Sequence, residues 1–269
     1  MTDHSSWALQ LQLLDIQRGS EKIEQMIVLD ARPQAQWQQG HLPGAFSLSW
    51  ENYTRTDSDG VKYRTLPAHE FAPKLAAMGI NPHSTLLIYG DADSSWGGEG
   101  WLAWVLAWLG HQGTVHFLDG GIQAWQQAGL PLNNHTPPLI RKQDRVVYQP
   151  QENTAMNIGA KELARNAERY TFIDTRNYWT EWLPGHIPGA IHIDWKLFHH
   201  GDSRRLIDGQ QLKTLLHENG VPLNKPIVYY CTGGIRSGFT WMVHSLTALP
   251  PAINYEGGTA EWDHYQNNQ

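Results

Sequence analysis

The chain of 269 residues has a formal net charge of −6, and 41% of its residues are hydrophobic. This length suits one large domain or two of ordinary size, and the apolar content is enough for packed cores. A chain without a basic excess cannot neutralise many phosphates, which argues against general nucleic-acid binding. The longest apolar stretch, residues 101–109, is too short to span a bilayer, so we expect no membrane association.

The first half of the chain alternates short apolar runs with segments of helical pattern. The apolar runs have the length and side-chain types of buried strands, and glycines follow the helical segments as stop signals. The expected strands are residues 25–29, 85–89 and 115–118, and the expected helices are residues 67–78 and 98–109, which end at Gly79 and Gly110.

The second half shows the same alternation. Strand–helix alternation is typical of βαβ units, so we expect an α/β fold with a largely parallel, buried sheet in each half. Active sites on such sheets lie at the carboxyl ends of the strands. The expected strands are residues 171–174, 226–230 and 253–255, and the expected helices are residues 160–168 and 210–218, the latter ending near Gly220.

Four segments of the first half recur, in the same order, in the second. Residues 27–32 match 171–176, residues 40–45 match 185–190, residues 86–91 match 226–231, and residues 117–121 match 254–258. Such ordered matches predict two copies of one domain. We place the copies at residues 1–129 and 156–269, joined by an extended linker, residues 130–155, that is rich in Pro, Asn and Gln.

The only cysteine, Cys231, follows the strand expected at residues 226–230 and precedes a helical segment. Two adjacent glycines allow the connecting loop to curl so that its N–H groups point at one spot. We interpret Ser237 as the helix N-cap. The loop residues after the cysteine, all candidates for substrate binding, are Thr232, Gly233, Gly234, Ile235, Arg236 and Ser237.

This loop favours a reactive thiolate at Cys231. A helix N-terminus and a neighbouring arginine such as Arg236 can lower a thiol pKa from ~8.5 to ~3.5–7.5. The alternative is a buried, inert cysteine that packs as a small hydrophobic side chain. Because the glycine pair, the arginine and the helix start follow at once, we prefer a nucleophile in an anion-binding loop. A single cysteine also excludes an internal disulfide.

Taken together, the two Gly-His-(Leu/Ile)-Pro-Gly-Ala segments, the cysteine loop and the Gly-Gly-x-x-x-x-Trp ends resemble the tandem-domain rhodanese family of sulfurtransferases. The resemblance covers nearly the whole chain and is thiosulfate sulfurtransferase-like. It implies a five-stranded parallel sheet flanked by helices in each domain, a catalytic C-terminal domain and an inactive N-terminal copy. Asp91 stands where Cys231 stands in the second copy, in agreement with an inactive first copy.

The family's chemistry implies that the Cys231 thiolate takes the outer sulfur of an anionic donor such as thiosulfate and becomes a persulfide. A thiophilic acceptor, cyanide or a thiol, then removes that sulfur, which makes the kinetics ping-pong. No metal or organic cofactor is needed, and the 14 histidines form no compact ligand set. We expect a cytoplasmic enzyme, because the first residues lack a secretory signal pattern.

Other functions stay open at this point. Four residues separate Cys231 from Arg236, whereas cysteine-dependent phosphatases resemble Cys-x5-Arg; a phosphatase or arsenate reductase is therefore the less favoured class. The donor could be 3-mercaptopyruvate, although Arg236 favours the compact charge of thiosulfate. The chain could also carry a persulfide to an acceptor protein.

Further candidates follow the second Asp-x-Arg segment. Arg176 lies on the same sheet edge as the cysteine loop and either binds the donor or pairs with Asp174. Thr180 replaces a second arginine found in the family. Trp195 forms either an apolar wall of the pocket or part of the core. We interpret His41 and His186 as turn residues that bond the backbone, and Glu256, Glu261 and Asp263 as surface or helix-end charges.

Overall fold

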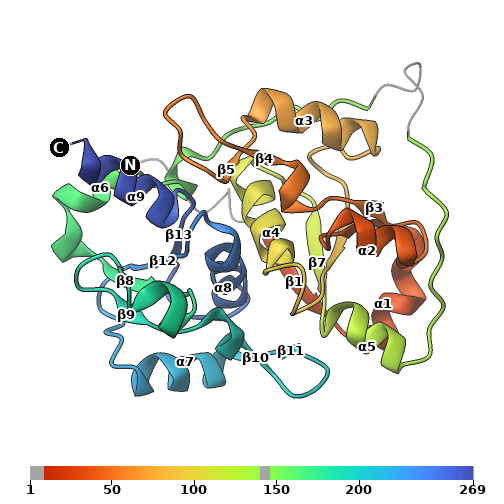
Figure 1. Cartoon of the computed structure of the whole chain (residues 1–269). Helices are drawn as coiled ribbons and strands as arrows, with labels where there is room; N and C mark the ends of the chain where they lie inside the picture. The colour runs from red at the N-terminus through yellow and green to blue at the C-terminus, as the bar shows by residue number, and fades with distance from the viewer. Residues whose placement is uncertain (1–8, 140–145, 269) are drawn as a thin grey trace.

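The computed structural model describes residues 9–139 and 146–268, which form two halves lying side by side (Figure 1). Each half has a parallel sheet flanked by helices, which confirms the fold class expected from the sequence. The first sheet has five strands in the order β1-β7-β6-β2-β3. Its strands are β1 (Gln10–Leu14), β2 (Ile27–Asp30), β3 (Phe46–Ser47), β6 (Leu86–Tyr89) and β7 (Thr114–Leu118).

Helices and one hairpin complete the first half. The helices expected at residues 67–78 and 98–109 are present, and the glycines that follow them, Gly79 and Gly110, adopt positive φ angles. The hairpin β4–β5 reaches toward the second half (Figure 1). The elements are α1 (Ile16–Lys22), η2 (Ile23–Gln25), α2 (Gln34–Gln39), η3 (Trp50–Asn52), β4 (Thr54–Arg55), β5 (Arg64–Thr65), α3 (Ala68–Ala77), α4 (Gly98–Trp108) and α5 (Gly121–Gln127).

The second sheet has four strands in the order β13-β12-β8-β9, so the expectation of five strands in each half was wrong here. The segment before this sheet, which includes residues 151–153, bonds to the end of α4 instead of adding a strand to the sheet. The amides of Gln151 and Asn153 donate to the carbonyls of Leu109 and Trp108 at the end of that helix. The four strands are β8 (Thr171–Asp174), β9 (Ile191–His192), β12 (Ile227–Tyr230) and β13 (Ile253–Tyr255).

The helix expected at residues 160–168 is split, and the one expected at residues 210–218 is present as α7. A second hairpin, β10–β11, reaches back toward the first half (Figure 1). The elements are η4 (Thr154–Met156), α6 (Ala160–Arg165), η5 (Ala167–Arg169), the π-helical turn η6 (Tyr178–Trp182), η7 (Trp195–Phe198), β10 (His199–His200), β11 (Arg205–Leu206), α7 (Gly209–Glu218), α8 (Ile235–Ser245) and α9 (Gly258–Asn267).

The predicted linker is partly described. Residues 140–145 of this segment lie outside the described residues. On one side of them, Asn133 forms an isolated antiparallel bridge with His41. On the other side, Tyr148 is buried and its ring stacks on His111. In the part of the chain that the structure describes, no helix combines the length and apolarity needed to cross a membrane.

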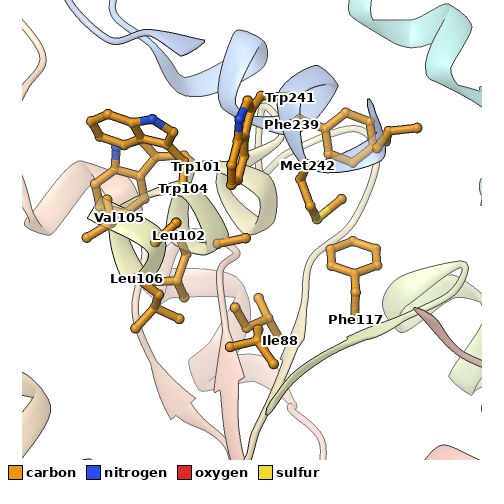
Figure 2. Packing of buried hydrophobic residues seen from close by; sticks show 14 of the residues in the cluster. Ile88, Trp101, Leu102, Trp104, Val105, Leu106, Phe117, Phe239, Trp241 and Met242 are labelled. Atoms are coloured by element: carbon orange, nitrogen blue, oxygen red, sulfur yellow. The ribbon is translucent and has the colours of Figure 1, made fainter. Parts of the chain in front are cut away.

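The two halves share a core along α4 and α8, which pack against each other at the centre of the molecule (Figure 1). Apolar side chains of both helices meet there with those of the first sheet (Figure 2). Gly100 of α4 and Gly238 of α8 let the backbones approach: a β-carbon on Gly238 would lie 2.8 Å from Trp101 Cα, and one on Gly100 would collide with the backbone of Phe239. The shared core fixes the second half's cysteine loop beside the first half.

Candidate active site

Cys231 lies immediately after β12, at the carboxyl end of a buried strand, and is only 1% exposed. The loop that follows is short, because α8 begins at Ile235 with Gly234 as its N-cap in the left-handed conformation, φ 81°. The interpretation of Ser237 as N-cap was therefore wrong. Ser237 lies in the first turn of the helix, and its Oγ is 3.6 Å from Cys231 Sγ. The same hydroxyl donates to Asn254 Oδ1 at 2.7 Å.

Burial opposes ionisation of the Cys231 thiol, yet the pKa of this thiol is lowered from its ordinary value. The Arg236 charge, hydrogen bonds from Ser237 and the backbone N–H of Gly233 together outweigh the burial. The loop donors and the start of α8 thus lie around the sulfur. A thiolate in this environment is a nucleophile held against a set of fixed donors.

The guanidinium of Arg236 is paired with Glu181, a residue that sequence reasoning did not single out. The two side chains make two short contacts, Nη1–Oε2 of 2.6 Å and Nη2–Oε1 of 2.7 Å. Thr232 Oγ1 bonds to both, at 3.1 Å from Glu181 Oε1 and 2.9 Å from Arg236 Nη2. Burial raises the pKa of Glu181, but hydrogen bonding to Arg236 outweighs it and lowers the pKa to about 2, so the carboxylate is ionised.

Glu181 reaches the loop because the chain after β8 forms a π-helical turn. Asn177 caps this turn by accepting from the amides of Trp179 and Thr180. The turn is followed by the Gly-His-Ile-Pro-Gly segment, and His186 Nδ1 lies 3.0 Å from Trp182 O, which confirms the turn role of this histidine. A π-helical turn beside a reactive group is a frequent feature of functional sites.

Two aromatic residues of the first half border the cysteine loop. The Trp96 ring lies under the guanidinium of Arg236, with 5.5 Å from Cζ to the ring centre, and this tryptophan is 50% exposed. The ring of Tyr63 lies against Gly233, where a β-carbon would come within 2.9 Å of the tyrosine Cγ. Both residues have positive φ angles, 54° and 65°. The site is thus assembled from both halves of the chain.

Arg176 is committed to Asp174. Its Nε and Nη2 donate to the two carboxylate oxygens at 3.0 and 2.7 Å, and Nη2 also donates to Gly185 O at 2.7 Å. Arg32 makes the same contacts with Asp30 in the first half, which has no cysteine. Since the arrangement is identical in both halves, the structure favours the pairing alternative for Arg176.

Two other predicted site residues, Trp195 and Ile235, are part of the apolar packing. Trp195 is buried and packs edge-on against Phe239 of α8 and against His199, while Ile235 is part of the shared core. The interpretation of Glu256 as a surface charge was wrong: this side chain is 3% exposed and its carboxylate pairs with Arg64 of the first half at 2.7 Å.

The register of the sheets corrects the alignment of the first-half loop. Tyr89 is the partner of Asp30 as Tyr230 is the partner of Asp174, so Gly90, and not Asp91, is the counterpart of Cys231. The following contacts agree, because Gly90 O accepts from Ile122 N at 3.0 Å and Cys231 O accepts from Thr259 N at 2.9 Å. Asp91 matches Thr232 instead and caps its own loop by accepting from the amides of Asp93 and Ser95.

Comparisons with known proteins relate the chain to sulfur-handling proteins. The sulfur carrier protein TtuD of Thermus thermophilus is 28% identical over 241 residues, which are 83% of this chain and 82% of that protein. The thiosulfate sulfurtransferases of Pseudomonas aeruginosa and Azotobacter vinelandii are each 26% identical, over 90% and 98% of this chain and 89% and 97% of their own lengths.

A solved structure shares the fold. The anaerobic ergothioneine biosynthesis enzyme from Chlorobium limicola, in complex with trimethyl histidine, has a TM-score of 0.79 at 21% identity, covering 96% of this chain and 69% of that one. Residues 12–128 and 159–265 match the rhodanese-like domain. With both halves matched, the tandem repeat is a repeat of this domain, and the chain belongs to the rhodanese family of sulfurtransferases.

Proposed function

We propose that this protein transfers sulfane sulfur from thiosulfate to a thiophilic acceptor through a persulfide on Cys231. The observation that carries the proposal is the thiol itself, with its pKa lowered by Arg236 and the loop donors in spite of complete burial. Two relatives named thiosulfate sulfurtransferase align with nearly the whole chain and support the choice of donor. The acceptors that we expect are cyanide and thiols.

The chemistry divides into two balanced half-reactions. In the first, the Cys231 thiolate attacks the outer sulfur of thiosulfate; the S–S bond of the donor breaks, and its electron pair leaves with sulfite. In the second, the acceptor attacks the terminal sulfur, and the electron pair of the persulfide S–S bond returns to Cys231. In both half-reactions, hydrogen-bond donors from Gly233 and Ser237 stabilise the negative charge on the Cys231 sulfur, as an oxyanion hole stabilises an oxygen anion.

Delivery of sulfur to an acceptor protein is a second candidate, favoured by the surface beside the site. The π-helical turn that carries Glu181 exposes Trp179 (73%) and is followed by Leu183 (54%), and the half-exposed Trp96 stacks on Arg236, the partner of Glu181. Exposed apolar side chains grouped around a reactive residue are typical of a docking surface. One relative is named a sulfur carrier protein.

Mass spectrometry tests the proposal directly. Thiosulfate should add one sulfur, ~32 Da, to the wild type, and cyanide should remove it with release of thiocyanate. Cys231→Ser should form no adduct and no thiocyanate, because a serine hydroxyl is not ionised at neutral pH and holds no persulfide. The same assay with 3-mercaptopyruvate compares the donors: faster loading from that donor would reverse our assignment. Thiocyanate production by Cys231→Ser would refute the role of the thiol.

A further inference from the structure

Glu256 is a buried carboxylate whose partners come from the other half of the molecule. It follows β13 and is 3% exposed. One oxygen pairs with Arg64 Nη1 at 2.7 Å, and the other accepts from the backbone N–H of Thr65 at 2.7 Å. Both partners belong to β5, in the hairpin that extends from the first half (Figure 1). A buried charge without these partners would strongly destabilise the folded state. The contacts with Glu256 therefore fix the hairpin and the carboxylate relative to each other.

The backbone of Glu256 also supports the cysteine loop. Gly234 has a positive φ angle of 81°, and a β-carbon there would lie 2.7 Å from Glu256 O and 2.8 Å from Glu256 Cα. The neighbouring Gly233 is covered by the side chain of Tyr63, the residue before Arg64. The glycine pair of the loop is therefore enclosed by two groups that the same hairpin holds in place.

The molecule contains the reciprocal arrangement in its other half. There the hairpin β10–β11 reaches from the second half to Asp119, the counterpart of Glu256: Leu206 N donates to Asp119 Oδ1 at 3.0 Å, and Arg205 Nη1 lies 3.6 Å from Oδ2. Arg204, which precedes this pair as Tyr63 precedes Arg64, likewise has a positive φ angle, 52°. We call each buried carboxylate with its two hairpin partners a clamp: Glu256 with Arg64 and Thr65, and Asp119 with Arg205 and Leu206. Only the Glu256 clamp borders a loop with a thiol.

Both halves have this hairpin contact, but only the one at Glu256 lies beside a thiol. We therefore propose that Tyr63, Arg64 and Thr65 are positioning residues for sulfur transfer. They act through Glu256 and Gly233 to hold the loop donors on Cys231, and this role rests on the sulfurtransferase activity proposed above. The first half, whose own loop has glycine at the cysteine position, thereby contributes to the chemistry of the second. Positive φ at Tyr63 and at Arg204 is a strained backbone conformation that the two hairpins share.

Substitution of the two equivalent arginines tests the proposal. Arg64→Gln removes the clamp at the cysteine loop, and Arg205→Gln removes its counterpart at the other end, so the second variant is the matched control. Because Cys231 is the only cysteine, the rate of alkylation by iodoacetamide as a function of pH reports its pKa. We expect Arg64→Gln to shift this profile upward by about half a pH unit or more, and to lower kcat/KM for thiosulfate about tenfold.

Arg205→Gln should leave the alkylation profile unchanged and kcat/KM within about twofold of the wild type. Arg64→Lys should show a smaller shift and a smaller loss of kcat/KM than Arg64→Gln, because a cation returns to Glu256. If Arg64→Gln proves too unstable to assay, the double variant Arg64→Gln/Glu256→Gln removes the unpaired buried charge and should show the same shift. Equal effects of the Arg64 and Arg205 variants, or no shift in either Arg64 variant, would overturn the proposal.

The alkylation arm separates this proposal from the proposed function. If no donor loads the wild type with sulfur, the sulfurtransferase assignment fails, yet the alkylation profiles still show whether the hairpin sets the reactivity of Cys231. If loading is normal but the Arg64 variants alkylate like the wild type, the hairpin proposal fails by itself.

Discussion

The carboxylate of Glu99 lies against Gly90, at the place that the Cys231 thiol takes in the other half. A β-carbon on Gly90 would collide with this carboxylate. Glu99 is the second residue of α4, as Arg236 is the second residue of α8, and each helix follows a left-handed glycine. The first half therefore has an acid where the second half has the cation of Arg236, and it has no space for a thiol.

A cysteine introduced into the first half should not restore activity to Cys231→Ser. Asp91→Cys places the thiol one residue beyond the equivalent position, and Gly90→Cys places it against Glu99. The first-half loop contains no arginine to stabilise a thiolate, and burial raises the pKa of a thiol, so neither variant should form a useful thiolate at neutral pH. Thiocyanate production from thiosulfate and cyanide measures the outcome. A rate above a few per cent of the wild type would show that the first loop is functional.

Glu99 should make the stability of the protein depend on pH. Burial raises the pKa of this carboxyl from 4.5 to about 8, although Ser95 donates to it. The folded state then binds the proton more tightly than the unfolded state. The contribution of the protonated Glu99 to the free energy of unfolding is therefore complete below pH 4.5. It is lost as the pH rises to about 8, at up to ~1.4 kcal/mol per pH unit.

Glu99→Gln removes this titration and should therefore stabilise the protein relative to the wild type, more at pH 8 than at pH 5. Urea unfolding of both proteins at the two pH values measures the difference. A constant difference between the two proteins across this range would contradict the assigned titration.

Arg236→Ala should chiefly impair the loading of Cys231. Burial raises the pKa of the Cys231 thiol, and the Arg236 charge lowers it. Without the guanidinium this pKa therefore rises, so less thiolate is present to attack the donor. Loss of a charge-assisted hydrogen bond, ~1.5–3 kcal/mol, corresponds to roughly a tenfold to hundredfold lower kcat/KM for thiosulfate. Cyanide discharge of a preformed persulfide should decrease less. Stopped-flow measurement of each half-reaction checks this, and equal losses in both would indicate that Arg236 mainly shapes the loop.

Glu181→Gln should have the opposite effect on donor binding. In the structure both carboxylate oxygens of Glu181 hold Arg236, and an anionic donor that uses this arginine must compete with them. The neutral amide weakens that competition and removes a negative charge beside the thiol, so the KM for thiosulfate should fall severalfold. Steady-state kinetics at varied thiosulfate and fixed cyanide measure the change. An increased KM would mean that Glu181 orients Arg236 for the donor.

Local sequence signals predicted what is local in the structure. The strand before Cys231, the loop glycines and the helix after them follow from short apolar runs and stop signals, and β13 was predicted to the residue. The first-half counterpart of Cys231 was misplaced by one residue because six residues separate Gly90 from the glycine cap of α4, whereas two separate Cys231 from Gly234. Only strand register resolves such a difference in loop length.

Contacts between distant segments could not be predicted in this way. Glu181 meets Arg236 across 55 positions and Thr65 meets Glu256 across 191, and neither pair leaves a periodic pattern in the sequence. The missing fifth strand of the second sheet has the same origin, because the chain before α6 bonds to the end of α4 in the other half. The burial of Glu256 beside Arg64 of the other half could not be predicted from the sequence, because burial is itself a product of the fold.

The close crossing of α4 and α8 at Gly100 and Gly238 has a consequence for how the molecule unfolds. With their backbones in contact and their apolar side chains in one core, neither half can lose its helix without exposing the core of the other. The two halves should therefore melt in one cooperative transition, with calorimetric and van't Hoff enthalpies that agree. Expressed alone, the half that carries Cys231 would present Phe239 and Trp241 to water and should aggregate, although it holds the reactive thiol.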